Sequence, residues 1–202
     1  NDLTIDAGAT LDCLLPDLTI RGDISNDGLL EAFQNTLTID HASYGEISGL
    51  GTFNLGNFDR IGGGITQVNA DLDINGNFSL DGGDMNFGTN EITVRKNAVI
   101  DGTMSFSGGT GLTFAGTSPQ MLNRTGTGST HIDILTTDNS QGISMTAGAG
   151  YHFIIGNALR MKRGVFDLRG NLLELGVNSD VVQVNAFGGS NMISTSGAYT
   201  NY

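Results

Sequence analysis

Two pairs of aspartates could supply the clustered carboxylates that polysaccharide cleavage uses. Asp71 and Asp73 stand at the start of one apolar triplet, and Asp81 and Asp84 flank a glycine pair. Enzymes that cleave glycans need clustered carboxylates, in some cases with Ca²⁺, and an arginine or lysine on the same face. Aspartate in a turn also caps the backbone without any chemistry. We expect these four residues to be solvated turn residues, with calcium binding as the alternative.

A basic patch lies toward the carboxyl-terminal part of the sequence. Four of the nine basic residues fall within ten positions: Arg160, Lys162, Arg163 and Arg169. Such a patch could bind an acidic glycan. Alternation along a strand would place Arg160 and Lys162 outward, with Leu159 and Met161 toward a core. We interpret the patch as a solvated strand face, and glycan binding stays open as the alternative.

Composition limits the possible partners. Nine Lys and Arg against 21 Asp and Glu give a formal charge of −12, which disfavours nucleic acid and anionic membranes. No apolar run approaches the roughly 18 residues that cross a bilayer, so we expect no membrane insertion. The single cysteine, Cys13, has no disulfide or histidine partner in sequence and is interpreted as a small buried apolar residue. We assign no catalytic, cofactor-binding or metal-binding residue.

Short apolar triplets recur at nearly constant spacing. They begin 20, 20, 20, 21 and 19 positions apart, at Leu72, Ile92, Leu112, Ile132, Phe153 and Leu172. Stacking equivalent strands about 4.8 Å apart would let each turn satisfy the backbone hydrogen bonds of its neighbours. The spacing predicts that these six residues form one buried column. It places Ile74, Val94, Phe114 and Ile134 in the column beside it.

The predicted fold is an all-β parallel β-helix with three short strands and about 20 residues in each turn. We expect it to be right-handed, by the general rule for parallel crossover connections. Less regular triplets at Leu3, Leu18, Leu37 and Phe53 bring the number of triplets to ten, which suggests about ten turns. An antiparallel sandwich also has short strands and frequent turns, but it predicts no recurrence every 20 residues.

The 20-residue repeat also predicts where two histidines lie relative to each other. His131 and His152 each end a turn, so they would stack about 5 Å apart. A shared metal would need a third ligand, and His41 lies several turns away.

Threonine is the middle residue of five triplets, which could indicate an ice-binding face: Thr4, Thr19, Thr38, Thr93 and Thr113. Because other residues interrupt this column, plain β propensity explains the threonines better.

Four stretches carry a resemblance to a known class of proteins. They read as strand, Gly or Asn corner, then strand: LTIDAGATL at 3–11, LTIRGDISNDGLL at 18–30, FAGTSPQML at 114–122 and LRMKRGVFDLRGNLLELG at 159–176. In this pattern the chain resembles the repetitive β-helical surface and secreted proteins of Bacteroidetes, many exported by the type IX secretion system. The resemblance implies an extracellular or cell-surface location and an adhesin-like or gliding-motility context. It implies no catalytic residue.

We expect residues 1–202 to form one β-helical segment, a fragment of a longer protein. Its expected function is a non-enzymatic structural or adhesive module that separates other domains of the same polypeptide or contacts glycans, cell-surface or secretion components. The alternative is a polysaccharide lyase or hydrolase, which would show carboxylates and an arginine converging on one lateral groove. An ice-binding solenoid is a third reading.

Overall fold

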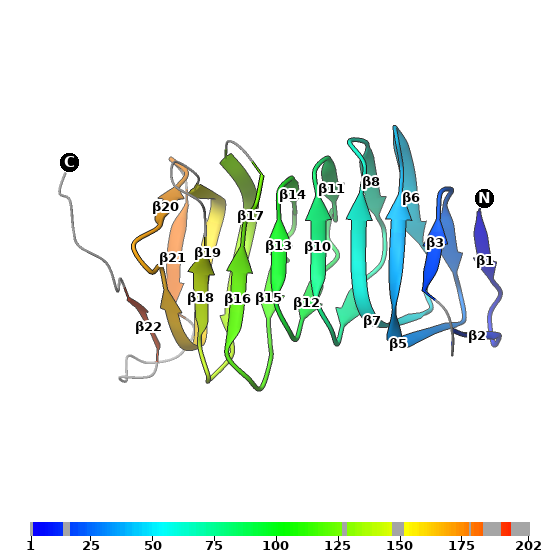
Figure 1. Cartoon of the computed structure of the whole chain (residues 1–202), viewed down its shortest axis with the longest axis horizontal. Helices are drawn as coiled ribbons and strands as arrows, with labels where there is room; N and C mark the ends of the chain where they lie inside the picture. The colour runs from blue at the N-terminus through cyan, green and yellow to red at the C-terminus, as the bar shows by residue number, and fades with distance from the viewer. Residues whose placement is uncertain are drawn as a thin grey trace.

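The computed structural model describes residues 2–13, 17–126, 129–146, 152–177, 179–183 and 191–194. These residues contain 22 β-strands and no helix. They form a parallel β-solenoid of about eight turns with about 21 residues in each turn, which confirms the predicted fold class. Figure 1 shows the turns following one another along a single axis, from β1 at one end to β22 at the other. No helix in the described part of the chain could span a membrane.

Each turn contributes one strand to each of three faces, and every strand pairs in parallel with its equivalents in the adjacent turns. Face I contains β1 (Leu3–Ile5), β4 (Ile24–Asn26), β6 (Tyr44–Ser48), β8 (Ile65–Val68), β11 (Asp84–Asn86), β14 (Thr103–Ser105), the first parts of β17 (Ser129–Asp138) and β19 (His152–Asp167), and β20 (Leu172–Leu175).

Face II contains β2 (Thr10–Asp12), the first parts of β5 (Leu29–Asp40) and β7 (Thr52–Ile61), β9 (Leu72–Ile74), β12 (Ile92–Val94), β15 (Leu112–Phe114), the second part of β17, the middle of β19, and β21 (Asp180–Gln183). Face III contains β3 (Leu18–Ile20), the second parts of β5 and β7, β10 (Phe78–Asp81), β13 (Ala98–Ile100), β16 (Gln120–Asn123), β18 (Ile143–Thr146), the last part of β19, and β22 (Asn191–Ser194).

The strands form because apolar and polar residues alternate over three or four positions and a flexible corner follows. In β12 the side chains of Ile92 and Val94 are fully buried, whereas Thr93 between them is only half-buried. The corner after β10 uses Gly82 and Gly83, whose φ angles are +80° and +70°. L-residues with a side chain rarely adopt this left-handed region, so glycine sets the corner.

The predicted column holds over three turns and then shifts. Leu72, Ile92 and Leu112 stack in register on face II. The prediction that Ile132 comes next is wrong, because Leu112 lies opposite Leu135 and Ile132 lies opposite Met104 on face I. Thr103 and His131 are partners 28 positions apart, whereas Asp84 and Thr103 are partners 19 positions apart. Because the corners after β15 and β16 are longer than their equivalents in the preceding turn, the triplet that begins at Ile132 lies on face I and not on face II.

The remaining members of the two predicted columns are displaced in the same way. Phe153 lies on face I opposite Leu173, and Leu172 lies opposite His152. Thr137, rather than Ile134, continues the column of Ile74, Val94 and Phe114.

The irregular amino-terminal triplets belong to different faces. Leu3 lies on face I, Leu18 and Leu37 pair on face III, and Phe53 lies on face II opposite Leu30. Ten triplets therefore do not mean ten turns, and the expected number is corrected to about eight.

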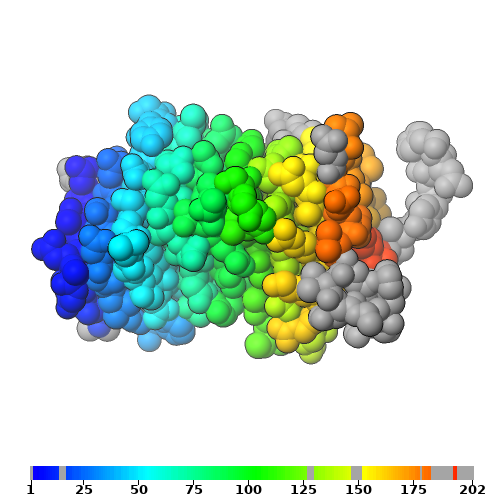
Figure 2. Space-filling view, turned by 180° about the vertical axis from the view of Figure 1, so that it is seen from behind, coloured from blue at the N-terminus to red at the C-terminus, as the bar shows by residue number. Residues whose placement is uncertain are grey.

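The inward side chains of the three faces form one hydrophobic core that runs through successive turns. Phenylalanines on the same face stack along the axis. The rings of Phe87 and Phe106 have centroids 4.8 Å apart, and those of Phe58 and Phe78 have centroids 5.9 Å apart. The opposite view in Figure 2 shows the turns as successive bands across one elongated body. Each turn is thus covered on both sides by its neighbours, except at the two ends.

Candidate functional site

Three carboxylates gather in a shallow groove on face II, which we call the acidic groove. It encloses about 330 Å³, and its polar lining comprises Thr52, Asp71, Asp73, Glu91 and Thr93. Asp71 and Asp73 thus share a groove with Glu91, a residue that sequence reasoning did not select. Glu91 could have been recognised from the sequence, because it lies 20 residues after Asp71 and so occupies the equivalent position in the next turn.

Each of these carboxylates has a protein partner one turn further along the chain. Asp71 Oδ1 accepts a 2.8 Å hydrogen bond from the backbone N–H of Glu91. Glu91 Oε1 accepts a 2.7 Å hydrogen bond from the hydroxyl of Thr113. Asp73 forms an ion pair with Arg95. One carboxylate of the groove, Asp73, therefore contacts an arginine, and the same contacts join consecutive turns to each other.

Asp81 and Asp84 do not join this group. Asp81 ends β10 on face III, Asp84 begins β11 on face I, and the glycine corner separates them. Within the described ranges, no group of three or more His, Cys, Asp or Glu side chains could hold a metal ion. Asp71 and Asp73 thus share face II, whereas Asp81 and Asp84 lie on either side of a corner between faces III and I.

A second groove lies at the corner between faces II and III, and we call it the corner groove. It encloses about 480 Å³, and its polar lining comprises Asn75, Arg95, Lys96, Asn97, Thr117 and Ser118. The corners of two successive turns contain three residues each, at 75–77 and 95–97, whereas the next contains five, at 115–119. The longer corner forms one wall of the groove. Sequence reasoning missed this site, although the SP dipeptide after β15 marks the longer corner.

Gln120 fixes that longer corner from beneath. Its side chain is 1% exposed. Its Nε2 donates a 3.0 Å hydrogen bond to the Val94 carbonyl, and its Oε1 accepts a 2.8 Å hydrogen bond from the Gly116 N–H. Asn139 also donates to Gln120 Oε1 at 2.8 Å and to the Ser118 carbonyl at 2.7 Å. The wall of the corner groove is therefore positioned by buried side chains of two turns.

The basic patch lies on the outside of β19 and beyond it. Leu159 and Met161 are buried, as alternation predicts. The Arg160 guanidinium donates to the Gly109 carbonyl, and Arg163 pairs with Asp138. Arg169 Nε lies 3.9 Å from Asp167 Oδ2. These arginines therefore have partners within the protein.

His131 and His152 do not stack on each other. His131 lies opposite Ile154, and His152 lies opposite Ser129, so they are offset by two residues on face I. Each pairs with its own acid: His131 Nε2 is 2.8 Å from Asp133 Oδ1, and His152 Nε2 is 3.1 Å from Glu174 Oε2. The prediction that His131 and His152 stack in adjacent turns is therefore wrong.

His41 belongs to a buried polar network at a corner between faces III and I. Arg60 Nε donates a 2.6 Å hydrogen bond to Thr66 Oγ1, and Arg60 Nη2 donates one of 2.7 Å to the Gly64 carbonyl. His41 Nδ1 lies 3.3 Å from Thr66 Oγ1, and His41 Nε2 lies 2.7 Å from the Gly22 carbonyl. The network satisfies buried polar groups that would otherwise destabilise the core.

The inward position of Arg60 could have been read from the sequence. In β7, Phe58 and Arg60 alternate inward, and the Arg60 side chain is completely buried. Burial lowers the pKa of Arg60, and the charges of Asp40 and Asp84 act in the opposite direction. Arginine stays charged under such conditions because its ordinary pKa lies far above neutral pH. A buried cation therefore lies at this corner, with its N–H groups directed at backbone carbonyls and the Thr66 hydroxyl.

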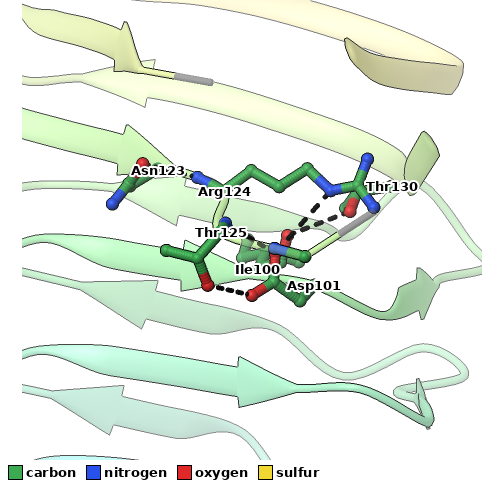
Figure 3. A network of polar contacts seen from close by, with 7 residues as sticks. Ile100, Asp101, Asn123, Arg124, Thr125 and Thr130 are labelled. Atoms are coloured by element: carbon green, nitrogen blue, oxygen red, sulfur yellow. Dashed lines mark hydrogen bonds and ion pairs between the residues drawn. The ribbon is translucent and has the colours of Figure 1, made fainter. Parts of the chain in front are cut away.

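A second polar network closes the corner after β13 and β16 (Figure 3). Asp101 accepts hydrogen bonds from the Thr125 N–H at 2.9 Å, the Thr125 hydroxyl at 2.6 Å and the Gly126 N–H at 2.7 Å. Arg124 Nε lies 3.6 Å from Asp101 Oδ1, and the two side chains are 1% and 8% exposed. Burial raises the pKa of Asp101, but these hydrogen bonds and the Arg124 charge outweigh it and hold the pKa below its ordinary value.

The threonines predicted as a possible ladder fall on three different faces. Thr4 lies on face I opposite Ser25, Thr19 and Thr38 pair on face III, and Thr93 and Thr113 pair on face II. The five triplets therefore do not present one continuous threonine column.

Cys13 is only partly buried and packs against the edge of the core in the first turn. Burial, and then the charge of Asp12, raise the pKa of its thiol. A raised pKa leaves less of the reactive thiolate at neutral pH. Cys13 was predicted to be a small buried apolar residue; it packs against the core but is only partly buried.

Comparisons with known proteins supply no family for this chain. No protein-family model matches it. Neither the curated proteins nor the solved structures give a significant match. The functional argument therefore depends on the geometry described above.

Proposed function

We propose that this chain is a non-enzymatic extracellular module, a stalk or adhesin segment of a secreted or cell-surface bacterial protein. The observation that carries the proposal is the single core that continues through successive turns. A solenoid with such a core behaves as a rod because each turn is held by its neighbours. A rod suits a module that separates domains of the same polypeptide or presents a long side to a glycan.

Side chains at the corners strengthen this rod. Between faces II and III, Asn57 Oδ1 accepts a 2.9 Å hydrogen bond from the Asn77 N–H, and Asn77 Oδ1 accepts one of 3.2 Å from the Asn97 N–H. Asn97 Oδ1 in turn accepts a 2.9 Å hydrogen bond from the Met121 N–H. This ladder of side-chain hydrogen bonds joins four turns in addition to the backbone pairing of the strands, so bending would break several contacts together.

The export route and source belong to the same proposal. The resemblance to repetitive surface proteins of Bacteroidetes supports delivery by the type IX secretion system. The negative formal charge of −12 supports a well-hydrated extracellular surface. Partners of the module would be neighbouring domains, glycans or cell-surface and secretion components. Localisation of the native protein in a Bacteroidetes host lacking that secretion system would test the route.

Rigidity can be measured with spin labels near the two ends. Thr4 and Leu172 are exposed on face I, on β1 and β20. In a Cys13→Ser background, cysteines at these two positions would carry the labels. We expect one narrow distance distribution in electron–electron double resonance. A broad distribution would contradict the rod.

A second candidate function is polysaccharide cleavage, which the acidic groove favours. Asp71, Asp73 and Glu91 share this groove, and Arg95 pairs with Asp73. This is the convergence of carboxylates and arginine that a glycan-cleaving site would show. Incubation with a panel of acidic polysaccharides, followed by chain length, would separate the two functions. Cleavage that disappears in Asp73→Asn would favour the enzyme.

A further inference from the structure

Lys96 is distinctive among the nine basic residues. Each of the others interacts with another group of the protein: Arg21, Arg60, Arg95, Arg124, Arg160, Lys162, Arg163 and Arg169. For the Lys96 ammonium no partner is found among the residues that the structure describes. Lys96 is exposed and lines the corner groove. A free cation in a concave site, on a chain with a charge of −12, is suited to an anionic ligand.

The other groups of the corner groove indicate what kind of anion it would accept. Asn75 contributes its Oδ1 and Asn97 its Nδ2, because the other amide atom of each already bonds within the protein, and Thr117 and Ser118 provide hydroxyls. These groups both donate and accept hydrogen bonds, as sugar hydroxyls require. Arg95, which already pairs with Asp73, adds a positive charge that is partly neutralised. The site therefore offers about one net positive charge beside several neutral polar groups.

We propose that the corner groove binds the carboxylate of a uronic acid unit within an extracellular polysaccharide, with Lys96 as the group that pairs with the carboxylate. The inference rests on the proposed adhesive role and names its partner. Strongly charged polyanions such as sulfated glycans or nucleic acid fit less well, because a chain with a formal charge of −12 repels a high density of negative charge. A uronate polymer instead presents single carboxylates separated by hydroxyls.

The groove is preformed, which favours binding. Gln120 and Asn139 hold the longer corner from beneath, so the ligand does not need to order that wall. A site that is fixed before binding loses less entropy when the ligand arrives. Repetition along the polymer could add neighbouring weak contacts on the same side of the rod.

The test is calorimetric titration of the whole chain with tetragalacturonate at low and at physiological salt. We expect wild type to bind, with weaker binding at higher salt. Lys96→Gln should weaken binding about tenfold or more, because a hydrogen bond to a charged group is worth roughly 1.5–3 kcal/mol. Lys96→Arg should restore most of the affinity. Arg21→Gln removes the same charge outside the groove and should bind as wild type does.

Two further ligands test whether the groove recognises a single carboxylate. The methyl ester of the same tetrasaccharide should bind more weakly than the acid, and a sulfated oligosaccharide of equal length should not bind better. Equal binding by Lys96→Gln and wild type, or by ester and acid, would overturn the site. Absence of wild-type binding together with a narrow spin-label distance would refute the glycan site and leave the structural role standing. Thermal unfolding of each variant shows that the fold is retained.

Discussion

Leu112 lies opposite Leu135 in adjacent strands of face II, and both side chains are completely buried. Leu112 also stacks on Ile92 in the preceding turn. A carboxylate at this position would lie in the core with no cation paired to it. The contact thus identifies a place where the solenoid depends on an apolar side chain.

We expect Leu112→Asp to lower the free energy of unfolding by several kcal/mol, because an unpaired buried charge costs roughly that amount. Thermal unfolding measures the effect. Met121→Asp is the matched control, since Met121 is 40% exposed on face III and should change stability by only about 0.5 kcal/mol. Similar transitions for Leu112→Asp and wild type would show that the assignment of this column is wrong.

The buried arginine gives the second prediction. Arg60→Met should cost about 3 kcal/mol or more, because the Gly62 and Gly64 carbonyls would lose their hydrogen-bond donors inside the protein. Chemical denaturation of both proteins checks this. Arg21→Met is a suitable comparison, because the Arg21 side chain is 71% exposed and its pair with Asp40 should contribute at most about 1 kcal/mol. Equal losses from the two substitutions would exclude a special role for Arg60.

The third prediction concerns pH. The pKa of Asp101 is lower in the folded protein than its ordinary value near 3.9, so its carboxylate stabilises the fold above that pH. This stabilisation should be lost as the pH falls below about 4 and through the folded-state pKa. Asp101→Asn should therefore lower stability by about 1–3 kcal/mol at pH 7 and by much less in acid. Melting temperatures between pH 7 and pH 3 measure the difference.

Asp81→Asn serves as the control for this pH series, because Asp81 is exposed at a corner. Its difference from wild type should stay small across the range. A constant difference between Asp101→Asn and wild type at every pH would contradict the electrostatic origin of the effect.

The fourth prediction separates backbone conformation from close packing at the corners. Gly164 and Gly82 have similar φ angles, +86° and +80°. A Cβ on Gly164 would lie 1.8 Å from the Asn139 carbonyl oxygen, whereas a Cβ on Gly82 would meet nothing within 4 Å. We expect Gly82→Ala to cost about 1–2 kcal/mol from the left-handed backbone alone. Gly164→Ala should cost clearly more, and equal melting temperatures would refute the clash.

Much of the fold was predictable because a solenoid repeats its local pattern. The alternation in β9, β12 and β15 identified Leu72, Ile92 and Leu112 as one column, and their pairing confirms it. The column then failed at Ile132. Apolar triplets on all three faces look alike in sequence, so only the lengths of the intervening corners distinguish them.

The grooves were less predictable than the core. Asp71 and Asp73 were recognised as possible site residues, and both line the acidic groove. Lys96 was not, because one lysine between strands carries no pattern of its own. Its position became informative only when the five-residue corner at 115–119 was placed beside it.

The sequence by itself determined that this chain forms short stacked strands around an apolar interior, because alternation and glycine corners act over a few residues. The tertiary structure decided which triplets share a face, that Arg60 and His41 meet at Thr66, and that the Lys96 ammonium lies in a groove with no partner among the described residues. These features depend on contacts between residues about 20 positions apart. A corner that lengthens by two residues changes such contacts without changing the local pattern.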